Sequence, residues 1–384
     1  YSPLVLGGSV LLLLFPLFMG TGLSEWATRA VVLLVAAAPC ALAMSTPVAM
    51  AAGIGTAGKA GVLIKGGAHL EALGKIHTVA FDKTGTLTKG NPTITDIVAS
   101  DGNQSELLRY AYSIERFSEH PLAKAIVRRA EEEGIPWADM SDFRAVAGYG
   151  ATATLGHETI WIGKEGLFKK MGIEGPTIPE VDKFREEGKT VLFLGTDQRI
   201  LGAIGMRDEL RPKAKVAVER LHEMGIKVVM LTGDNETTAK AIAQQLGIDE
   251  VRAGLKPEEK LSAIKELEEK YGPVAMVGDG INDAPALAQA TLGIAMGTAG
   301  TDAAIEAADV ALMADDLTKI SDALRLGKKA RKISIQNIVF SICILAVLIP
   351  AALAGMMSVA VAVFFHEASE ILAVANGLRV AKGL

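Results

Sequence analysis

A carboxylate followed by hydroxyl side chains and a glycine is the first group in this sequence that could do chemistry. Asp82 follows the short apolar run 78–81 and begins the polar segment 82–88, which reads DKTGTLT. The run predicts a buried strand, and open α/β sheets bind ligands at the carboxyl ends of their strands. A carboxylate in that place can attack a phosphoryl group and become an acyl phosphate. We therefore predict that Asp82 is a nucleophile, although a strand that ends in Asp is by itself only a turn signal.

Three later segments supply groups that suit phosphoryl transfer. TGD at 232–234 and GDGIND at 278–283 each follow an apolar run, and KPEEK at 256–260 lies between them. Thr232 could hold the phosphoryl group with its hydroxyl, and Lys260 could neutralise the charge of the pentacoordinate state. Catalysis of this reaction is mostly positioning and charge stabilisation, so a high density of fixed charge is expected.

Two carboxylates in the last of these segments predict a magnesium site. Asp279 and Asp283 are four residues apart. Magnesium prefers hard oxygen ligands, and one or two carboxylates with phosphate oxygens suit it. The predicted ligands are Asp82, the Thr84 carbonyl and Asp279, with Asp283 orienting the loop.

This ordered set of motifs resembles the P-type ATPases. DKTGTLT is the phosphorylation signature of that family, and the other three segments follow it in the family's order. The set also resembles the wider haloacid dehalogenase superfamily, whose phosphotransferases share this layout. The resemblance implies ATP and Mg²⁺ as cofactors and an aspartyl-phosphate intermediate at Asp82. Taken singly, TGD or GDG would indicate only a surface turn.

The elements that must position these residues alternate between strand-like and helix-like segments from residue 77 to about 326. Apolar runs at 228–231 and 274–277 alternate with helical patterns at 213–224, 236–246 and 258–269. That alternation predicts a doubly wound parallel sheet. We expect a Rossmann-like, haloacid dehalogenase-like phosphorylation domain formed by residues 77–90 and 202–326.

Residues 91–201 interrupt that pattern and predict an inserted α+β domain. Helical patterns lie near 106–116 and 122–133, and strand patterns at 151–155, 159–162 and 191–196. Within this segment, SEHPL at 118–122 followed by GYG at 148–150 resembles the nucleotide-binding domain of heavy-metal (type IB) P-type ATPases.

The resemblance of the inserted domain implies a set of nucleotide-binding residues. Glu115 and His120 would contact adenine, while Gly148 and Gly150 would let the backbone approach the nucleotide. Lys164 stands where members often carry Asn. The DELRP segment that begins at Asp208 resembles the hinge that returns to the phosphorylation domain, and Asp208 is counted with the nucleotide site.

Both ends of the chain are apolar. Uncharged stretches occupy 4–23 and 30–57, separated by a polar break at 21–29, and two more occupy 333–353 and 359–378. Stretches of about 20 apolar residues can cross a bilayer. We expect two transmembrane helices within residues 1–76 and two within 327–384. Lysines and arginines flank the middle of the chain, which the positive-inside rule places in the cytoplasm of a multi-pass protein of the plasma or inner membrane.

Charge and cysteine content exclude some functions. The formal net charge is −5 and no basic stripe occurs, which argues against nucleic-acid binding. The two cysteines, Cys40 and Cys343, lie in separate apolar runs, so no disulfide framework is indicated.

Residues in the apolar ends could bind a transition metal. Cys40 follows Pro39 in the second apolar run, and Pro39 breaks the backbone hydrogen bonding of a helix. In the last run, HEASE at 366–370 places His366, Glu367 and Glu370 among apolar residues, where ionisable groups are costly and usually functional. The alternatives are a small packing residue at Cys40 and a buried His–Glu structural pair.

These residues resemble the metal site of heavy-metal pumps. Such pumps carry CPC, SPC or CPH at the first segment, and here Ala38 replaces the first ligand. The His–Glu pair resembles the cobalt/zinc-type branch, with Glu370 where that branch has Thr. A mixture of thiolate, imidazole and carboxylate suits Zn(II), Co(II) or Cd(II) better than Cu(I). The predicted transported-ion ligands are Cys40, His366, Glu367 and Glu370.

The sequence therefore predicts ATP-driven export of a divalent transition metal. The alternatives are a potassium-type P-ATPase subunit, which needs neither Cys40 nor the His–Glu pair, and a membrane-tethered phosphatase of the dehalogenase superfamily. A non-catalytic membrane receptor is a further alternative, disfavoured by the complete phosphorylation set.

The sequence looks like the C-terminal part of a longer protein. It begins directly before a hydrophobic run and contains no TGE, the actuator-domain motif that positions water for dephosphorylation in this family. The expected partners are the transported metal, the bilayer, and the N-terminal helices and actuator domain of the same protein.

These 384 residues should therefore be phosphorylated by ATP without sustained turnover, because the group that positions the hydrolytic water is absent from them. A time course of phosphate release by the purified chain checks this expectation. Release that continues through many turnovers would contradict it.

Overall fold

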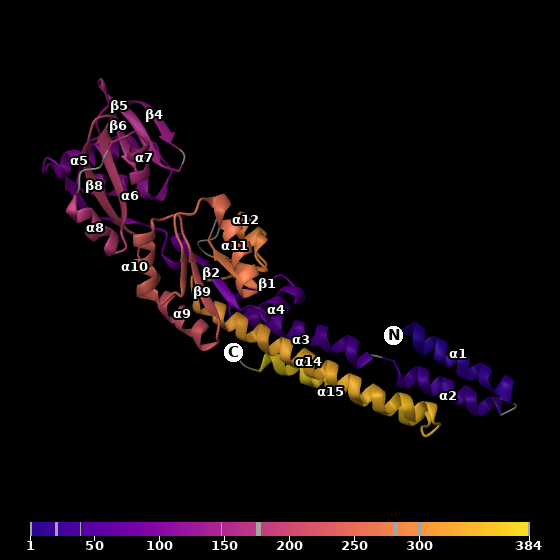
Figure 1. Ribbon diagram of the computed structural model, residues 1–384. Helices are drawn as coiled ribbons and strands as arrows, with labels where there is room; N and C mark the ends of the chain where they lie inside the picture. The colour runs from indigo at the N-terminus through magenta and orange to yellow at the C-terminus, as the bar shows by residue number, and fades with distance from the viewer. Residues whose placement is uncertain are drawn as a thin grey trace. The chain divides into compact units, whose positions relative to one another are not determined.

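The computed structural model describes residues 2–19, 22–38, 40–146, 148–173, 178–279, 283–297 and 302–382. It divides into two compact units, one formed by His77–Thr318 and the other by Tyr1–Ile76 with Lys319–Leu384 (Figure 1).

A parallel sheet is the framework of the His77–Thr318 unit. Its strands lie in the order β13-β12-β11-β2-β9-β10, and β2 is hydrogen-bonded to both β11 and β9. Every residue of β2, β11, β12 and β13 is buried, as expected where helices cover both faces of a parallel sheet. The bounds are β2 Thr78–Asp82, β9 Lys227–Leu231, β10 Glu250–Arg252, β11 Val274–Gly278, β12 Leu292–Met296 and β13 Val310–Leu312.

Helices alternate with these strands, so the predicted α/β class is confirmed. The two ends of α10 show how the local sequence sets the bounds of a helix. At its start the Asn235 side chain accepts a hydrogen bond from Thr238 N, and at its end Gly247 adopts φ +77°. The helices are α9 Ala214–Glu223, α10 Glu236–Leu246, α11 Pro257–Tyr271, α12 Ala284–Gln289 and α13 Asp302–Ala307.

The segment inserted after β2 forms an antiparallel sheet with helices on both faces. Its strands run in the order β3-β8-β7-β6-β5-β4. One face packs against α5 and α6 through a core that includes Leu108, Ile126 and Ile162, and the other packs against α7 and α8 through Phe168 and Phe184. The elements are β3 Thr93–Ala99, α5 Gln104–Glu115, α6 Pro121–Glu132, β4 Ser141–Val146, β5 Gly150–Leu155, β6 Glu158–Gly163, α7 Glu165–Lys170, α8 Pro179–Glu186, β7 Thr190–Thr196 and β8 Ile200–Arg207.

The antiparallel sheet is larger than its sequence pattern indicates. Strand β8 pairs with β3 as far as Arg207 and with β7 as far as Met206, beyond residue 201, where the sequence placed the domain boundary. Strand β4 has no buried residue, so it gives no apolar alternation from which a strand could be predicted.

The other unit is helical. It contains α1 Ser2–Met19, α2 Leu23–Ala36, α3 Cys40–Lys59, α14 Thr318–Leu353 and α15 Val359–Leu378, with the shorter β1 Val62–Ile64, α4 Gly67–Leu73 and the single turn Arg379–Ala381. Among the described residues, three segments are long and apolar enough to cross a membrane, namely Leu23–Lys59, Thr318–Leu353 and Val359–Ala381, and Pro3–Phe18 is a shorter apolar helix. Pro39 lies outside the described residues.

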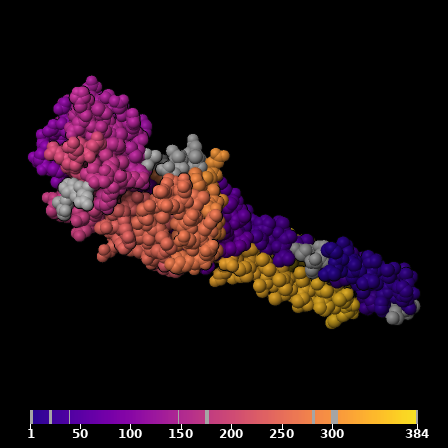
Figure 2. All heavy atoms as spheres, turned by 45° about the horizontal axis from the view of Figure 1, so that its top comes forward, coloured from indigo at the N-terminus to yellow at the C-terminus, as the bar shows by residue number. Residues whose placement is uncertain are grey.

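These helices expose large apolar side chains, and they form the indigo and yellow parts of the surface in Figure 2. Leu11, Phe18, Val347 and Phe364 are each at least two-thirds exposed. Apolar residues exposed all along helices of this length are typical of a surface that lipid covers.

The polar break at 21–29 is helical over most of its length, because α2 begins at Leu23. Glu25 and Arg29 are one helical turn apart, and Arg29 Nη2 lies 2.5 Å from Glu25 Oε1. The Arg29 guanidinium also lies over the Trp26 ring. Because the two charges pair along one face, they are compatible with a continuing helix.

We expect Phe81→Ala to lower the free energy of unfolding by about 3–5 kcal/mol, because it deletes a fully buried ring in the central strand β2. Urea unfolding followed by circular dichroism measures the change. Met313→Ala is the matched control, since Met313 is 63% exposed and its loss should cost less than about 0.5 kcal/mol. Equal losses for the two variants would contradict the proposed position of β2.

Candidate active site

The polar residues that follow three adjacent strands meet at one edge of the parallel sheet. Asp82 is the last residue of β2 and pairs in register with Leu231, the residue before Thr232. On the other side Phe81 pairs with Val277, two residues before Asp279. The carboxyl ends of parallel strands form the usual ligand-binding edge of such sheets.

Lys260 joins two carboxylates at the centre of this edge. Its Nζ lies 2.5 Å from Asp82 Oδ1 and 2.7 Å from Asp283 Oδ1. All three side chains are at least 90% buried. Asp82, Asp279 and Asp283 each present an oxygen within 4.8 Å of the others. The structure thus brings these four predicted residues together.

Negative charge exceeds positive charge in this cluster. Burial, with the nearby Asp283 charge, raises the pKa of Asp82 to about 7 despite the attraction of Lys260. Burial and Asp283 likewise raise the pKa of Asp279 to about 6. Burial opposes the charge of Lys260, but Asp82 and Asp283 outweigh it and raise its pKa. A carboxyl whose pKa is raised in this way is one that a divalent cation would stabilise as the anion, so the donor set fits Mg²⁺.

The turn 83–87 after Asp82 requires a glycine. Gly85 has φ +76°, and a Cβ at that position would lie 1.5 Å from Asp279 Oδ2. The close approach of the two loops therefore depends on Gly85. The Thr84 side chain next to it is exposed, while Thr232 is buried and its Oγ1 accepts a hydrogen bond from Asp234 N. Residues 280–282 of the GDGIND segment lie outside the described residues.

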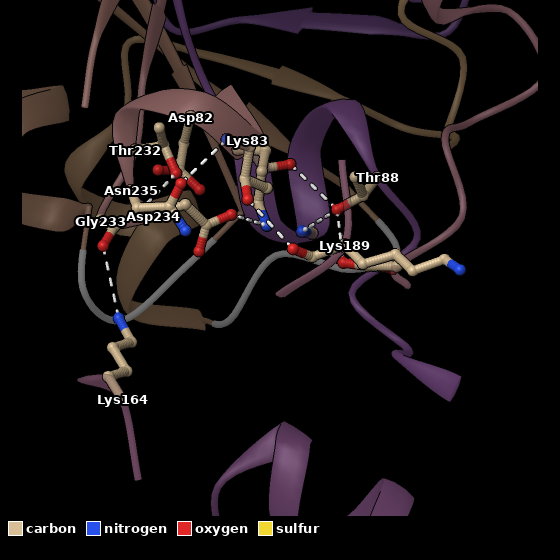
Figure 3. Close-up of polar contacts among 12 residues, drawn as sticks. Asp82, Lys83, Thr88, Lys164, Lys189, Thr232, Gly233, Asp234 and Asn235 are labelled. Atoms are coloured by element: carbon tan, nitrogen blue, oxygen red, sulfur yellow. Dashed lines mark hydrogen bonds and ion pairs between the residues drawn. The ribbon is translucent and has the colours of Figure 1, made fainter. Parts of the chain in front are cut away.

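Lys83 and Arg211, which the predicted set of site residues did not include, hold the loops around Asp82 in place. Lys83 Nζ lies 2.5 Å from Asp234 Oδ2, and the pair is largely buried (Figure 3). Arg211 donates from Nη2 to Gly85 O at 2.7 Å and from Nε to Thr86 O at 2.9 Å. Lys83 lies in the DKTGTLT motif and Arg211 in the DELRP motif. Their partners are far away in the sequence, so no local pattern predicts these contacts.

Asp208 lies where the inserted segment returns to the parallel sheet. Its Oδ2 accepts a hydrogen bond from Thr88 Oγ1 at 2.5 Å, and its Oδ1 accepts one from Asn91 N at 3.2 Å. Asp208 therefore joins the outgoing and returning chain segments. No contact with Glu115 or His120 is found among the described residues.

Two of the predicted nucleotide residues, Glu115 and His120, have shifted pKa values. His120 caps α6 by accepting a hydrogen bond from Leu122 N, and partial desolvation together with the Lys164 charge lowers its pKa. Burial raises the pKa of Glu115 to about 7, against the opposing effect of its hydrogen bond with Ser118.

The two glycines differ in their surroundings. Gly148 has φ +77° with open space at its Cβ position, whereas a Cβ on Gly150 would lie 2.0 Å from Ile162 O. Gly150 is therefore required by strand pairing, whatever it contributes to a ligand.

Three of the four predicted transported-ion ligands come together in the helical unit. Cys40 is the first residue of α3, and His366 and Glu370 lie one turn apart on α15. Their ligand atoms are all within 4.8 Å of one another. The side chain of Glu367 is exposed, and Glu367 is not part of this group.

The comparisons with known proteins agree with this geometry. Residues 76–291, more than half of the chain, match the family model of haloacid dehalogenase-like hydrolases. The chain belongs to the haloacid dehalogenase-like hydrolase family.

Within that family, similarity to P-type ATPases extends over nearly the whole chain. A probable cadmium-transporting ATPase of Staphylococcus aureus (strain MRSA252) is 41% identical over 99% of this chain and 54% of its own length. A zinc-transporting ATPase of Bacillus subtilis (strain 168) is 42% identical over 98% of this chain and 60% of its own. This haloacid dehalogenase-like chain thus spans between half and two-thirds of the length of these relatives.

A solved structure gives the same result. A zinc-transporting PIB-type ATPase in its E2·Pi state is 38% identical with a TM-score of 0.74, over 99% of this chain and 62% of that one. The resemblance to heavy-metal P-type ATPases and the expected fold class are therefore confirmed.

The raised pKa of Asp82 predicts a pH-dependent response to Mg²⁺. Between its ordinary pKa of 3.8 and about 7, the folded haloacid dehalogenase-like domain keeps a proton that the unfolded chain releases. This carboxyl's contribution to stability therefore falls as the pH rises through that window. Because Mg²⁺ needs the ionised form, it should raise the Tm more at about pH 8 than at about pH 5.

Differential scanning fluorimetry of the purified chain with and without MgCl₂ measures the effect. Asp82→Asn should reduce the difference between the two pH values, and Asp139→Asn, which alters an exposed carboxyl, should preserve it. A Mg²⁺ effect independent of pH in the unmodified chain would contradict the site.

Proposed function

We propose that this chain contains the catalytic domains and part of the membrane domain of an ATP-driven exporter of a divalent transition metal. The observation that carries the proposal is the buried cluster of Lys260 with Asp82 and Asp283, beside Asp279 at the edge of the parallel sheet. The helical unit adds a second cluster, of Cys40, His366 and Glu370. The first suits phosphoryl transfer and the second suits binding of a transition metal.

In the proposed reaction Asp82 is phosphorylated by ATP. A carboxylate oxygen of Asp82 forms a bond to the γ-phosphorus while the bond from phosphorus to the bridging oxygen of ADP breaks. Water later cleaves the acyl phosphate and returns Asp82 and inorganic phosphate. Lys260 lies 2.5 Å from Asp82 and can neutralise charge on the transferring group, while Asp283 fixes the position of the ammonium. The Thr232 hydroxyl would bind a phosphoryl oxygen.

Mg²⁺ would be held by Asp82, the Thr84 carbonyl and Asp279. When bound, it supplies positive charge that offsets the surplus of carboxylates and the phosphate oxygens. Asp279 and Asp82 are suited to this because burial raises the pKa of both, and a bound divalent cation would stabilise their ionised forms.

ATP would bind to the inserted domain, with its adenine near Glu115 and His120 and its phosphates toward Asp82. Lys164 Nζ lies 3.3 Å from Gly233 O in the TGD loop (Figure 3), so this nucleotide-domain residue contacts the phosphorylation site. Gly148 leaves open space in which a nucleotide could approach the backbone. Asp208, by contrast, would act by joining the two chain segments that connect the domains.

The proposed cargo is Zn(II), Co(II) or Cd(II). A thiolate, an imidazole and a carboxylate suit these ions better than Cu(I), which prefers softer sulfur ligands. Relatives named for cadmium and for zinc transport are consistent with this choice. The spans Leu23–Lys59, Thr318–Leu353 and Val359–Ala381 would cross the plasma or inner membrane, with residues 77–318 in the cytoplasm.

We expect Asp82→Asn in the full-length protein to abolish acid-stable labelling by ATP carrying a radioactive γ-phosphate, because the amide cannot form the acyl phosphate. Nucleotide binding, measured by equilibrium dialysis, should be unchanged. Asp139→Asn is the control and should label normally. Label that persists in Asp82→Asn would refute the assignment of the nucleophile.

The two glutamates of α15 provide a second test. Glu370→Gln should abolish stimulation of ATP hydrolysis by Zn²⁺, Co²⁺ or Cd²⁺ in the full-length protein, because Glu370 lies with Cys40 and His366. Glu367→Gln is the matched control. It removes the same charge from a side chain three residues before Glu370 that is not part of the group, so it should retain the stimulation. The reverse pattern would replace Glu370 by Glu367 in the site, and stimulation by K⁺ alone would exclude a transition-metal cargo.

A further inference from the structure

A buried hydroxyl in the helical unit has no hydrogen-bond partner among the described residues. Ser341 lies on α14 and is 4% exposed, and its Oγ is fully buried without a donor or acceptor. Buried hydroxyl groups are nearly always hydrogen-bonded, because leaving one unpaired is costly. An unpaired Oγ here therefore calls for a ligand or a water.

Several other hydroxyl side chains on these helices donate to a carbonyl of their own helix. Ser9 donates to Val5 O at 3.0 Å, and Thr56 donates to Ala52 O at 2.8 Å, each one turn back. Ser369 donates to His366 O at 2.7 Å. Ser341 has the same local option and does not use it. Its hydroxyl is thus left available.

The side chain of Ser341 lines a small cavity in the helical unit. The cavity has a volume of about 10 Å³, which is the room that one water molecule or an ion of similar size occupies. His366 and Ser369 of α15 and Ala38 before α3 also line it. Ser341 therefore lines the same cavity as His366, one of the three clustered ligands.

Among the described His, Cys, Asp and Glu side chains, this cluster has three members. Zn(II) in proteins is almost always bound by four ligands in a tetrahedron, and Cys40, His366 and Glu370 supply three. The side chain of Ala38, two residues before Cys40, has no donor atom. A thiolate and a carboxylate already balance the two charges of the ion, so a neutral fourth donor keeps the loaded site neutral in a medium where net charge is costly.

We propose that Ser341 Oγ is the fourth donor to the transported divalent ion. This inference rests on the proposed function and adds a ligand from a third helix. It joins α14 to the α3 and α15 ligands, and its hard oxygen shifts the site further from Cu(I) and toward Zn(II), Co(II) or Cd(II).

Co²⁺ binding to the purified full-length protein tests the proposal, because the visible spectrum of Co²⁺ reports its coordination. Ser341→Ala should weaken Co²⁺ binding by about tenfold or more, the range known for loss of a supporting metal-site group, and should change the visible bands. The Tm without metal should not fall, because the hydroxyl removed has no protein partner. A merely structural serine would lower the Tm instead.

Ser9→Ala is the matched control, because Ser9 is 3% exposed and bonded to its own helix, and it should bind Co²⁺ as the unmodified protein does. Ser341→Cys places a thiolate at the same position, and it should restore binding and add a sulfur-to-cobalt charge-transfer band. Cys40→Ala shows whether the membrane site itself exists.

The outcomes separate this inference from the function on which it rests. If Cys40→Ala weakens Co²⁺ binding and Ser341→Ala changes neither the affinity nor the spectrum, Ser341 is not a ligand and the exporter proposal stands. Equal weakening by Ser9→Ala and Ser341→Ala would also overturn the inference. If Cys40→Ala binds Co²⁺ normally, the proposed metal site is wrong.

Discussion

A single buried lysine that faces more carboxylates than it can neutralise is the constraint on which the phosphorylation site depends. Lys260 pairs with Asp82 and Asp283, while Asp279 stays within 4.8 Å of both carboxylates. Helix α11 sets the position of this lysine, because Pro257 begins the helix and the Glu259 side chain accepts a hydrogen bond from Lys256 N. The cluster is therefore built to need a further cation, which is the property required of a site that binds a magnesium-bound phosphate.

Contacts from outside the strands hold the loop that carries the nucleophile. Arg211 binds two carbonyls of the turn after Asp82 and also pairs with Asp315 at 2.9 Å. Asp208, three residues earlier, binds the segment that leaves for the inserted domain. The short stretch that returns from the inserted domain thus fixes both the phosphorylation loop and the outgoing chain. A movement of the inserted domain would act directly on this stretch.

In the helical unit, too, the structure depends on how buried charged and polar groups are paired, here in a medium of lower polarity. Ionisable and polar groups among apolar helices need partners, and most of those described have them. Asn337 donates to Ala373 O, and Asn376 donates to Asn337 Oδ1, so this polar pair joins α14 to α15. Cys40, His366 and Glu370 instead lie with their ligand atoms within 4.8 Å of one another, and Ser341, which lines a cavity with His366, has no hydrogen-bond partner among the described residues. The proposed cargo ion would bind to these groups.

The chain's local patterns determined the strands, the catalytic motifs and the apolar ends. A buried parallel strand is an uninterrupted apolar run, and the residue after it must lie at the sheet edge, so Asp82, Thr232 and Asp279 could be placed together from spacing alone. Only the tertiary structure decided which groups complete the sites. Lys83 with Asp234, Arg211 with the turn carbonyls, and Ser341 with the cavity are pairings of residues far apart in the chain. The tertiary structure also placed Glu370 rather than Glu367 with Cys40. Which of the two glutamates faces Cys40 depends on the rotation of α15 relative to α3, and that rotation is set by packing along both helices rather than by any single sequence motif.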